Sequence, residues 1–160
     1  MDKQRAHQLI LQRLDADLDV AVRAARTAHE AATHEENIAE NKYDTLGLEA
    51  AYLAAGQSRR VEEIRQALAS FQGLVLRDFD ADLGIQTSAL VELADHEDRR
   101  RWLFLGPDAA GLKIELDGHE VLVITPRSPL GGALLGRHPG DEIEVGLGSA
   151  RQAYEIVATR

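Results

Sequence analysis

The chain contains no cysteine, only four prolines, and few aromatic side chains, which amount to 4% of its 160 residues. The missing thiols exclude disulfides, thiolate catalysis and metal sites built on cysteine, and they are compatible with a reducing compartment. Apolar residues nevertheless make up 44% of the chain. The sequence can therefore bury a mainly aliphatic core, in one ordinary domain or in a slim element plus a small one.

Long apolar runs are also absent. The amino-terminal residues lack the apolar segment of about 7 to 15 residues that a secretory signal needs, and no run approaches the roughly 18 residues that span a bilayer. We therefore expect a cytoplasmic protein without membrane contact. With 27 acidic and 18 basic residues the net charge is -9, which argues against a protein that coats nucleic acid with its whole surface. Local basic patches remain compatible with this charge.

The motifs of several catalytic classes are missing as well. Neither of the glycine-rich phosphate loops, GxxxxGK[ST] and GxGxxG, occurs, and no pair of histidines has the HxxxH or HExxH spacing of a zinc site. The six histidines are therefore expected at the surface: His7, His29, His34, His96, His119 and His138. The run Arg99-Arg100-Arg101 suits either a phosphate or acidic partner, or an exposed turn between two strands.

Composition divides the chain in two. Up to about residue 75 it is rich in alanine, leucine, glutamate and arginine with only three glycines, which predicts helix. From about Asp80, short β-branched and leucine runs alternate with glycine, aspartate and proline, which predicts strands and turns. We predict an α+β protein with two domains, residues 1–76 and 77–160, joined by a linker near residues 77–84.

The helical half carries two series of mostly apolar residues at alternating spacings of three and four. The first series is Leu11, Leu14, Leu18, Ala21, Ala25, Ala28 and Ala32, and the second is Ala50, Ala54, Gln57, Val61, Ile64, Leu68 and Phe71. This spacing is typical of a coiled-coil seam. Because the two series are mirror images about position 41, they predict an antiparallel hairpin with its tip at Asn41 and with Asp44 as the cap of the second helix.

The predicted hairpin is long and thin. A first helix from about residue 6 to 38 is on the order of 50 Å long, which exceeds the expected width of the second domain. We therefore expect a projecting arm that inserts into something narrow. An ordinary helical hairpin, packed on the second domain or on another copy of the chain, is the alternative that the spacing leaves open.

Charge is unevenly distributed along this hairpin. Residues 30–49 hold one base, Lys42, and six acids: Glu30, Glu35, Glu36, Glu40, Asp44 and Glu49. Further back, at about 25 Å from the tip, four arginines form a predicted basic collar. They are Arg23 and Arg26 on the first helix and Arg59 and Arg60 on the second. The alternative is that these charges only keep the helix surface soluble, because charge runs of this kind are common on solvent-exposed helices.

Clustered carboxylates at the tip suit a hard cation. Mg2+ prefers one or two carboxylates together with waters and substrate oxygens, and it can activate water for phosphodiester cleavage. In a helix, Glu36 and Glu40, or Glu40 and Asp44, are neighbours at positions i and i+4 and can act together.

The second half contains five runs that predict strands: residues 89–93, 101–105, 112–116, 120–125 and 153–158. Asp117-Gly118 is a strong signal for a two-residue hairpin between the third and fourth runs. One short helix is delimited by Ser128 as N-cap, Pro129 at its first position and Gly136 at its end. The prediction is a small antiparallel sheet with one short helix.

The same half contains the long pattern SPLxxALLGxxxGDExEV, from Ser128 to Val145, flanked by Gly106-Pro107-Asp108 and Tyr154-Glu155-Ile156. Together with the antiparallel coiled coil and its acidic tip, these segments closely resemble the bacterial GreA/GreB transcript cleavage factors over nearly the whole chain. The resemblance implies an FKBP-like second domain that docks at the rim of the secondary channel of bacterial RNA polymerase. The segment Ser128, Pro129 and Leu130 is expected to dock there.

The resemblance also implies that the arm enters the channel. Glu36, Glu40 and Asp44 are then expected to act in the cleavage of backtracked RNA. Glu40 and Asp44 would ligate a second Mg2+ that is shared with the polymerase and is not bound tightly by the isolated protein. The catalytic centre would belong to the polymerase, so the protein itself is not expected to be an enzyme. The basic collar would face the 3′ segment of the nascent RNA.

The tip departs from the family's pattern, which is an acid, two spacers and a second acid before asparagine. Aligned without gaps from the second helix, Glu40 takes the first acidic place and Tyr43 the second, while Asp44 lies one residue further on. A shifted alignment instead puts Asn37 first and Glu40 second. A regulator that binds the same channel without stimulating cleavage is therefore the alternative function. The predicted strand 112–116 with its hairpin is also additional to the family's pattern.

Two further classes stay open beside the polymerase-binding ones. One is an unrelated coiled-coil scaffold, and the other is a prolyl isomerase, suggested by the FKBP-like fold. An isomerase pocket needs several aromatic walls, and the core will claim some of those that the second half offers. These are mainly Phe79, Trp102, Phe104 and Tyr154.

Overall fold

The computed structural model describes residues 1–34 and 46–160. These residues form two compact units, which we call the helical unit (residues 13–68) and the sheet unit (residues 1–12 together with 69–160). The chain thus enters the helical unit from the sheet unit and returns to it. The predicted tip at Asn41 and the predicted cap Asp44 lie outside the described residues.

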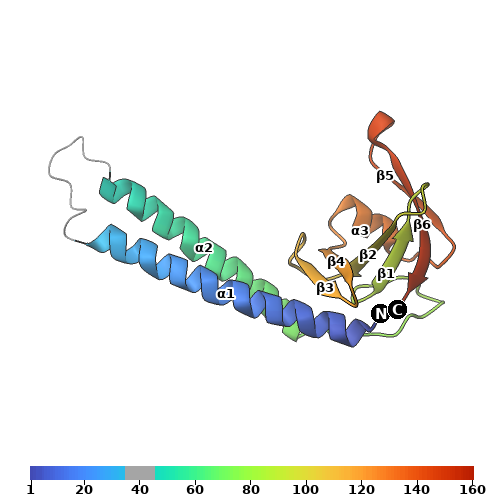
Figure 1. Ribbon diagram of the computed structural model, residues 1–160, viewed down its shortest axis with the longest axis horizontal. Helices are drawn as coiled ribbons and strands as arrows, with labels where there is room; N and C mark the ends of the chain where they lie inside the picture. Colours follow the sequence, from blue (N-terminus) through green and yellow to red (C-terminus); the bar gives the residue numbers. More distant parts are fainter. Residues whose placement is uncertain (35–45) are drawn as a thin grey trace. The chain divides into compact units, whose positions relative to one another are not determined.

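Two long helices, α1 (Lys3–Thr33) and α2 (Leu46–Gln72), run antiparallel as a hairpin (Figure 1). Helix α1 begins three residues earlier than predicted because Asp2 caps it. The Asp2 carboxylate accepts hydrogen bonds from the backbone N–H groups of Gln4 and Arg5 at 2.9 and 3.3 Å. Among the described residues, no helix is long and apolar enough to cross a membrane.

Burial in the two helices confirms the predicted seam. None of the fourteen seam residues is exposed, and seven are fully buried: Leu14, Ala21, Ala28, Ala54, Val61, Ile64 and Phe71. Near the base the buried stripe is wider than a simple seam, because Ile10 and Ala67 are buried beside the half-buried Leu11 and Leu68.

In the described part of the chain, six strands form one sheet. They are β1 (Leu90–Ala94), β2 (Arg100–Leu105), β3 (Lys113–Leu116), β4 (His119–Ile124), β5 (Glu142–Val145) and β6 (Gln152–Thr159). Their order is β3-β4-β2-β1-β6-β5. All five predicted runs are strands, whereas β5 was not predicted. The predicted antiparallel pairing is confirmed for four of the five neighbouring pairs, while β2 and β4 run parallel.

The β3–β4 hairpin turns at the predicted dipeptide. Asp117 and Gly118 have φ values of 52° and 77°. Positive φ at both central residues is the geometry that matches the twist of the two strands. Residues of β3 and β4 pair directly on either side, with Leu116 opposite His119.

The two faces of the sheet pack on different elements. One face holds a hydrophobic core that includes Val91, Leu103 and Ile156 together with Leu134 of the short helix α3 (Pro129–Leu134). Side chains alternate along β2, so Phe104 points to the opposite face, where its ring lies 6.1 Å from that of Phe71 in the last turn of α2. The sheet unit therefore has three layers, with the sheet in the middle.

Candidate functional site

The expected catalytic residues Glu36, Glu40 and Asp44 lie outside the described residues, so their arrangement stays a prediction. The nearest described acids are Glu30 in α1 and Glu49 in α2, and both are exposed. Over residues 1–34 and 46–160, no group of three or more histidines, aspartates or glutamates is placed to hold a metal ion.

The four arginines of the predicted collar are all exposed on the helical unit: Arg23 and Arg26 on α1, Arg59 and Arg60 on α2. Arg23 donates from Nε to the backbone oxygen of Asp19 at 3.3 Å, one turn earlier. The Arg60 guanidinium lies 3.6 Å from the Glu63 carboxylate, and both side chains are more than half exposed. Neither contact removes its arginine from solvent, so these charges are accessible to an anionic partner.

The expected docking segment, Ser128 to Leu130, is the start of α3 and has a fixed geometry. The Ser128 hydroxyl donates to the backbone oxygen of Thr125 at 2.8 Å and accepts from the N–H of Gly131 at 3.0 Å. This confirms Ser128 as N-cap, with the exposed Pro129 at the first helical position. Leu130 is half-buried against the core.

Gly131 explains why this turn is tight. A Cβ atom at this position would lie 1.9 Å from the backbone oxygen of Thr125, which is far inside van der Waals contact. The close approach of Gly131 to Thr125 is what allows Ser128 to make both of its hydrogen bonds. The segment therefore presents Pro129 on a rigid base.

The end of α3 is tied to the linker that precedes β1. Gly136, with φ of 75°, donates to the backbone oxygen of Ile85 at 2.8 Å, and Ile85 donates back to Arg137 at 2.8 Å. His138 stabilises the same region: its Nε2 lies 2.6 Å from the backbone oxygen of Ala81, and its ring meets the edge of the Phe79 ring at 6.0 Å. His138 thus has a structural role in this loop.

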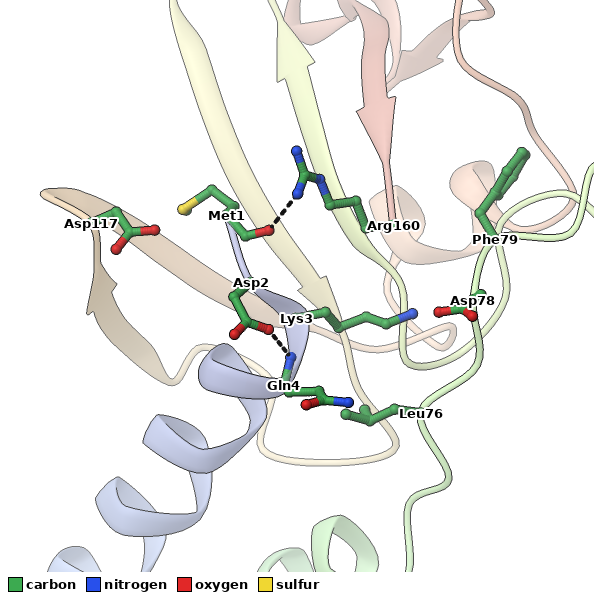
Figure 2. A pocket seen from close by; sticks show the side chains of 9 residues that line it. All are labelled: Met1, Asp2, Lys3, Gln4, Leu76, Asp78, Phe79, Asp117 and Arg160. Atoms are coloured by element: carbon green, nitrogen blue, oxygen red, sulfur yellow. Dashed lines mark hydrogen bonds between the residues drawn. The ribbon is translucent and has the colours of Figure 1, made fainter.

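Lys3 is a buried residue that the sequence interpretation missed. It is only 9% exposed, its Nζ donates to the backbone oxygen of Arg77, and Figure 2 shows its side chain directed at Asp78. Burial lowers the pKa of Lys3, and the charge of Asp78 partly offsets this. A signal was present in the sequence, because Lys3 precedes Ala6 and Ile10 on the same helix face at spacings of three and four.

Lys3 lines a pocket of about 550 Å³ in the sheet unit (Figure 2). Its charged lining residues are mixed in sign: Asp2, Lys3, Asp78, Asp117 and Arg160. Arg160 also donates to the backbone oxygen of Met1 at 2.9 Å. Because both cations and carboxylates line this pocket, it selects for no single ligand charge.

The arginine run has partners within the chain. Arg99 binds Asp95 at 2.7 Å, Arg100 lies 2.9 Å from Asp98, and Arg101 donates to the hydroxyl of Tyr154 at 3.1 Å. Of the aromatic residues considered for an isomerase pocket, Phe104 and Tyr154 are buried in the core, while Phe79 and Trp102 are half-buried. Phe79 and Trp102 line different pockets.

Comparison with known proteins identifies a matching family and several relatives in sequence. The profile of "Transcription elongation factor, GreA/GreB, C-term" matches residues 84–160. The transcription elongation factor GreA of Desulfovibrio desulfuricans is 31% identical over 150 residues, which are 92% of this chain and 83% of the relative. GreA of Nitratidesulfovibrio vulgaris is 29% identical over 150 residues, 92% of this chain and 84% of the relative.

Solved structures give a weaker likeness. The GreA factor homolog 1 (Gfh1) of Thermus thermophilus is 21% identical, with 94% of each chain covered and a TM-score of 0.39. A GreA/GreB factor of Nitrosomonas europaea is 20% identical, covering 70% of this chain and 91% of its own, with a TM-score of 0.37. The assignment therefore rests on the sequence relatives, and by their identity and coverage this chain belongs to the GreA/GreB family of transcription elongation factors.

Proposed function

We propose that the protein binds bacterial RNA polymerase through its secondary channel and stimulates Mg2+-dependent cleavage of backtracked nascent RNA. The observation that carries this proposal is the 31% identity to a GreA elongation factor across 83% of that relative. Two long helices on either side of an acid-rich segment support it. The protein acts as an accessory factor, because the reaction centre belongs to the polymerase.

The proposed metal ligands fit Mg2+ by their chemistry. Glu40 and Asp44 are carboxylates, the donors that Mg2+ combines with water and substrate oxygens. When bound, Mg2+ supplies a Lewis acid that activates water for phosphodiester cleavage. The role of this chain is to bring Glu36, Glu40 and Asp44 to that ion on a segment that α1 and α2 carry. Two or three carboxylates do not close a coordination shell, so the isolated protein binds Mg2+ weakly.

The exposed arginines of the collar act on the RNA. Arg23, Arg26, Arg59 and Arg60 attract the phosphates of the extruded 3′ segment without reading its sequence.

The rigid start of α3 acts on the polymerase. Because the hydrogen bonds of Ser128 fix this turn in advance, docking through Pro129 and Leu130 loses little conformational entropy.

A second candidate function is a channel-binding regulator that does not stimulate cleavage. The observation that favours it is Tyr43, which occupies the place of the second tip acid in the ungapped alignment. A phenol is neutral near pH 7, so it contributes neither the charge nor the ligand strength of a carboxylate. The edge strand β3 with its hairpin, additional to the family's pattern, also changes the surface available for docking.

A backtracked elongation complex distinguishes the two functions. The purified protein is added with Mg2+, and short 3′ RNA products are followed over time. We expect products with the natural chain and none with the double variant Glu40→Ala/Asp44→Ala. The control is Glu30→Ala/Glu49→Ala, which removes the same charge from exposed helix positions and should still cleave. Binding of the double variant to polymerase should remain intact.

Other outcomes decide the alternatives. Absence of products together with competition against a known channel binder would select the regulator. Undiminished cleavage with the Glu40/Asp44 variant would refute the assignment of the tip carboxylates. A protein that binds no polymerase at all would overturn both functions.

A further inference from the structure

One side of α2 carries an exposed aromatic ring. Among the phenylalanine, tyrosine and tryptophan residues that the structure describes, only Tyr52 is exposed, with 69% of its surface accessible. Leu48 lies one turn earlier on the same side of the helix and is 54% exposed. Aromatic side chains are only 4% of the chain, so a tyrosine left outside the core is informative. The Tyr52 ring is available to a ligand.

Arg59 lies on the same side of α2 as Tyr52. The two residues are seven positions apart, which is two helical turns, and both are exposed. Tyr52 and Arg59 each precede a buried seam residue, Ala54 and Val61, by two positions. Because two positions turn a helix by about 200°, the side opposite the seam carries both Tyr52 and Arg59. Both residues therefore face away from α1.

Gly56 lies between these two residues and leaves a notch in the helix surface. A Cβ atom at Gly56 would lie 3.9 Å from Nη2 of Arg59, so the guanidinium reaches back along α2 towards Tyr52. Apart from the backbone of α2 itself, no other described atom lies within 4 Å of that position. A glycine inside a helix is destabilising relative to alanine. The notch is therefore open, with an aromatic ring at one end and a guanidinium at the other.

The Arg59 guanidinium is not engaged within the described part of the chain. Its neighbour Arg60 lies 3.6 Å from Glu63, whereas no hydrogen bond or ion pair of Arg59 occurs within residues 1–34 and 46–160. All five N–H donors of this guanidinium can therefore serve an anion. Phosphate is the anion whose geometry a guanidinium matches with two parallel hydrogen bonds.

The notch matches one unit of a single nucleic-acid strand. A base stacks on an aromatic ring, and its phosphate binds a guanidinium. Tyr52 and Gly56 are roughly 6 Å apart along the helix axis, a separation that one nucleotide can bridge. An apolar side chain of a protein partner would cover Tyr52 and Leu48 but would leave the charge of Arg59 without a counterion. The combination of ring and cation therefore favours RNA over an apolar protein surface.

We propose that Tyr52, Gly56 and Arg59 form a stacking site for one base of the extruded 3′ segment of the nascent RNA. The Tyr52 ring stacks on the base, and Arg59 holds the phosphate. The site accepts any base, because every base has a π-face. This proposal rests on the proposed function for the source of the RNA. The binding step itself involves only this chain and the strand.

Binding of RNA by the full chain tests the stacking step directly. A labelled single-stranded oligoribonucleotide and an abasic strand of the same length are titrated at low salt, and fluorescence anisotropy is followed. Tyr52→Leu should weaken binding of the normal strand about ten-fold and leave the abasic strand unchanged, whereas Tyr52→Phe should retain most of the affinity. Arg59→Gln should weaken binding of both strands and lower the salt slope by about 0.7.

Two results of this titration would overturn the proposal. One is unchanged affinity of a folded Tyr52→Leu variant for the normal strand. The other is the absence of saturable binding by the natural chain at millimolar concentration. Far-UV circular dichroism verifies that each variant is folded.

A matched pair of variants tests the notch. Gly56→Gln fills it with an uncharged side chain and also removes a glycine from the helix interior, so it should weaken RNA binding while raising the midpoint of thermal unfolding. Ser58→Gln adds the same side chain about 200° further around α2, at an exposed position, and should leave RNA binding unchanged. Unfolding cannot explain a loss in the more stable variant. Equal RNA affinities of the two variants would contradict the notch.

A backtracked elongation complex separates this proposal from the proposed function. If the natural chain yields no 3′ products, the proposed function fails, while the titrations with RNA still decide the role of Tyr52. With an active natural chain, Tyr52→Leu should raise the protein concentration needed for half-maximal cleavage and leave polymerase binding unchanged. Weaker polymerase binding by Tyr52→Leu with unchanged RNA affinity would assign Tyr52 to a protein contact and overturn the proposal.

Discussion

The rings of Phe71 and Phe104 lie 6.1 Å apart and join the last turn of α2 to the end of β2. Both side chains are fully buried. The His7 ring stacks on Phe71 at 6.3 Å, and the Nε2 of His7 lies 2.7 Å from the backbone oxygen of Phe71. This cluster holds the ends of both long helices against the sheet within the sheet unit.

Phe71→Ala should destabilise the protein by about 3 to 5 kcal/mol, because it removes a buried aromatic ring and leaves a cavity. Urea unfolding of the full chain measures this loss. The control is Val75→Ala, since Val75 is 67% exposed and its truncation should change stability by less than about 0.5 kcal/mol. Similar losses for the two variants would contradict a core role for Phe71.

Gly131→Ala should destabilise the sheet unit more than Ser128→Ala does. Loss of the Ser128 cap costs about 1 kcal/mol, whereas a Cβ at Gly131 would lie 1.9 Å from the backbone oxygen of Thr125 and must displace it. Gly56→Ala is the contrasting control, because its Cβ meets only the end of the Arg59 side chain at 3.9 Å within α2. That variant should stabilise by about 0.5 to 1 kcal/mol. Thermal unfolding compares the three.

Asp95 should titrate at unusually low pH. The hydrogen bond from the Arg99 side chain, helped by the backbone N–H groups of Arg99 and Glu97, lowers the pKa of Asp95 from 3.8 to about 2. Because the folded-state pKa is the lower one, the stabilising contribution is present above pH 3.8 and is lost as the pH falls towards 2. Carboxyl NMR measures the titration. Arg99→Gln should return the pKa towards 3.8, and Arg100→Gln should leave it unchanged.

Lys3 should make stability rise at alkaline pH. Burial holds its pKa in the folded chain below the ordinary 10.5, so the unfolded chain binds more protons as the pH approaches that value. The cost of burying the charge is present below the folded pKa and disappears as the pH rises towards 10.5. Unfolding measured at a series of alkaline pH values should show this rise in the natural chain and a smaller one in Lys3→Met. Identical curves would contradict burial of the charged form.

Removing collar charge should weaken the action of the protein on backtracked complexes. Arg59→Gln/Arg60→Gln is expected to raise the protein concentration needed for half-maximal RNA cleavage, most clearly at low salt, because phosphate attraction is lost. The control is Arg13→Gln, which removes an exposed arginine paired with Asp17 outside the collar. An equal effect of Arg13→Gln would show that only the overall charge matters.

Local periodicity predicted most of the fold. The seam was predictable because alanine and leucine at spacings of three and four line one side of a long helix, where they are buried against a partner helix. The α3 cap and the Asp117-Gly118 turn were predictable because each depends on a few adjacent residues. Strand β5 was missed although Ile143 is buried between the exposed Glu142 and Glu144, because four alternating residues are a weak signal.

What the sequence did not predict depends on residues far apart in the chain. The parallel pairing of β2 with β4 places β3 outside both, and no local pattern encodes that order. Lys3 and Ile10 are buried although neither belongs to the predicted seam between the two helices. Their burial depends on packing of the first turns of α1 within the sheet unit, which the seam pattern does not describe. The contact of Arg101 with Tyr154 joins residues 53 positions apart. In the candidate docking segment, Ser128 as N-cap and Pro129 at the first helical position were predicted because their geometry is local, whereas their docking role stays a prediction.

The sheet unit consists of two stretches of chain, residues 1–12 and 69–160, and the helical unit lies between them in the sequence. During synthesis the first stretch must wait for the second before His7 can stack on Phe71. Because the helical unit joins the sheet unit at only two places in the chain, we expect that hairpins of other lengths or tip sequences can replace it, provided that both junctions and the contacts of Phe71 are kept. Chains that combine the sheet unit of this protein with the hairpin of a GreA relative would then separate the contribution of the tip from that of the sheet unit.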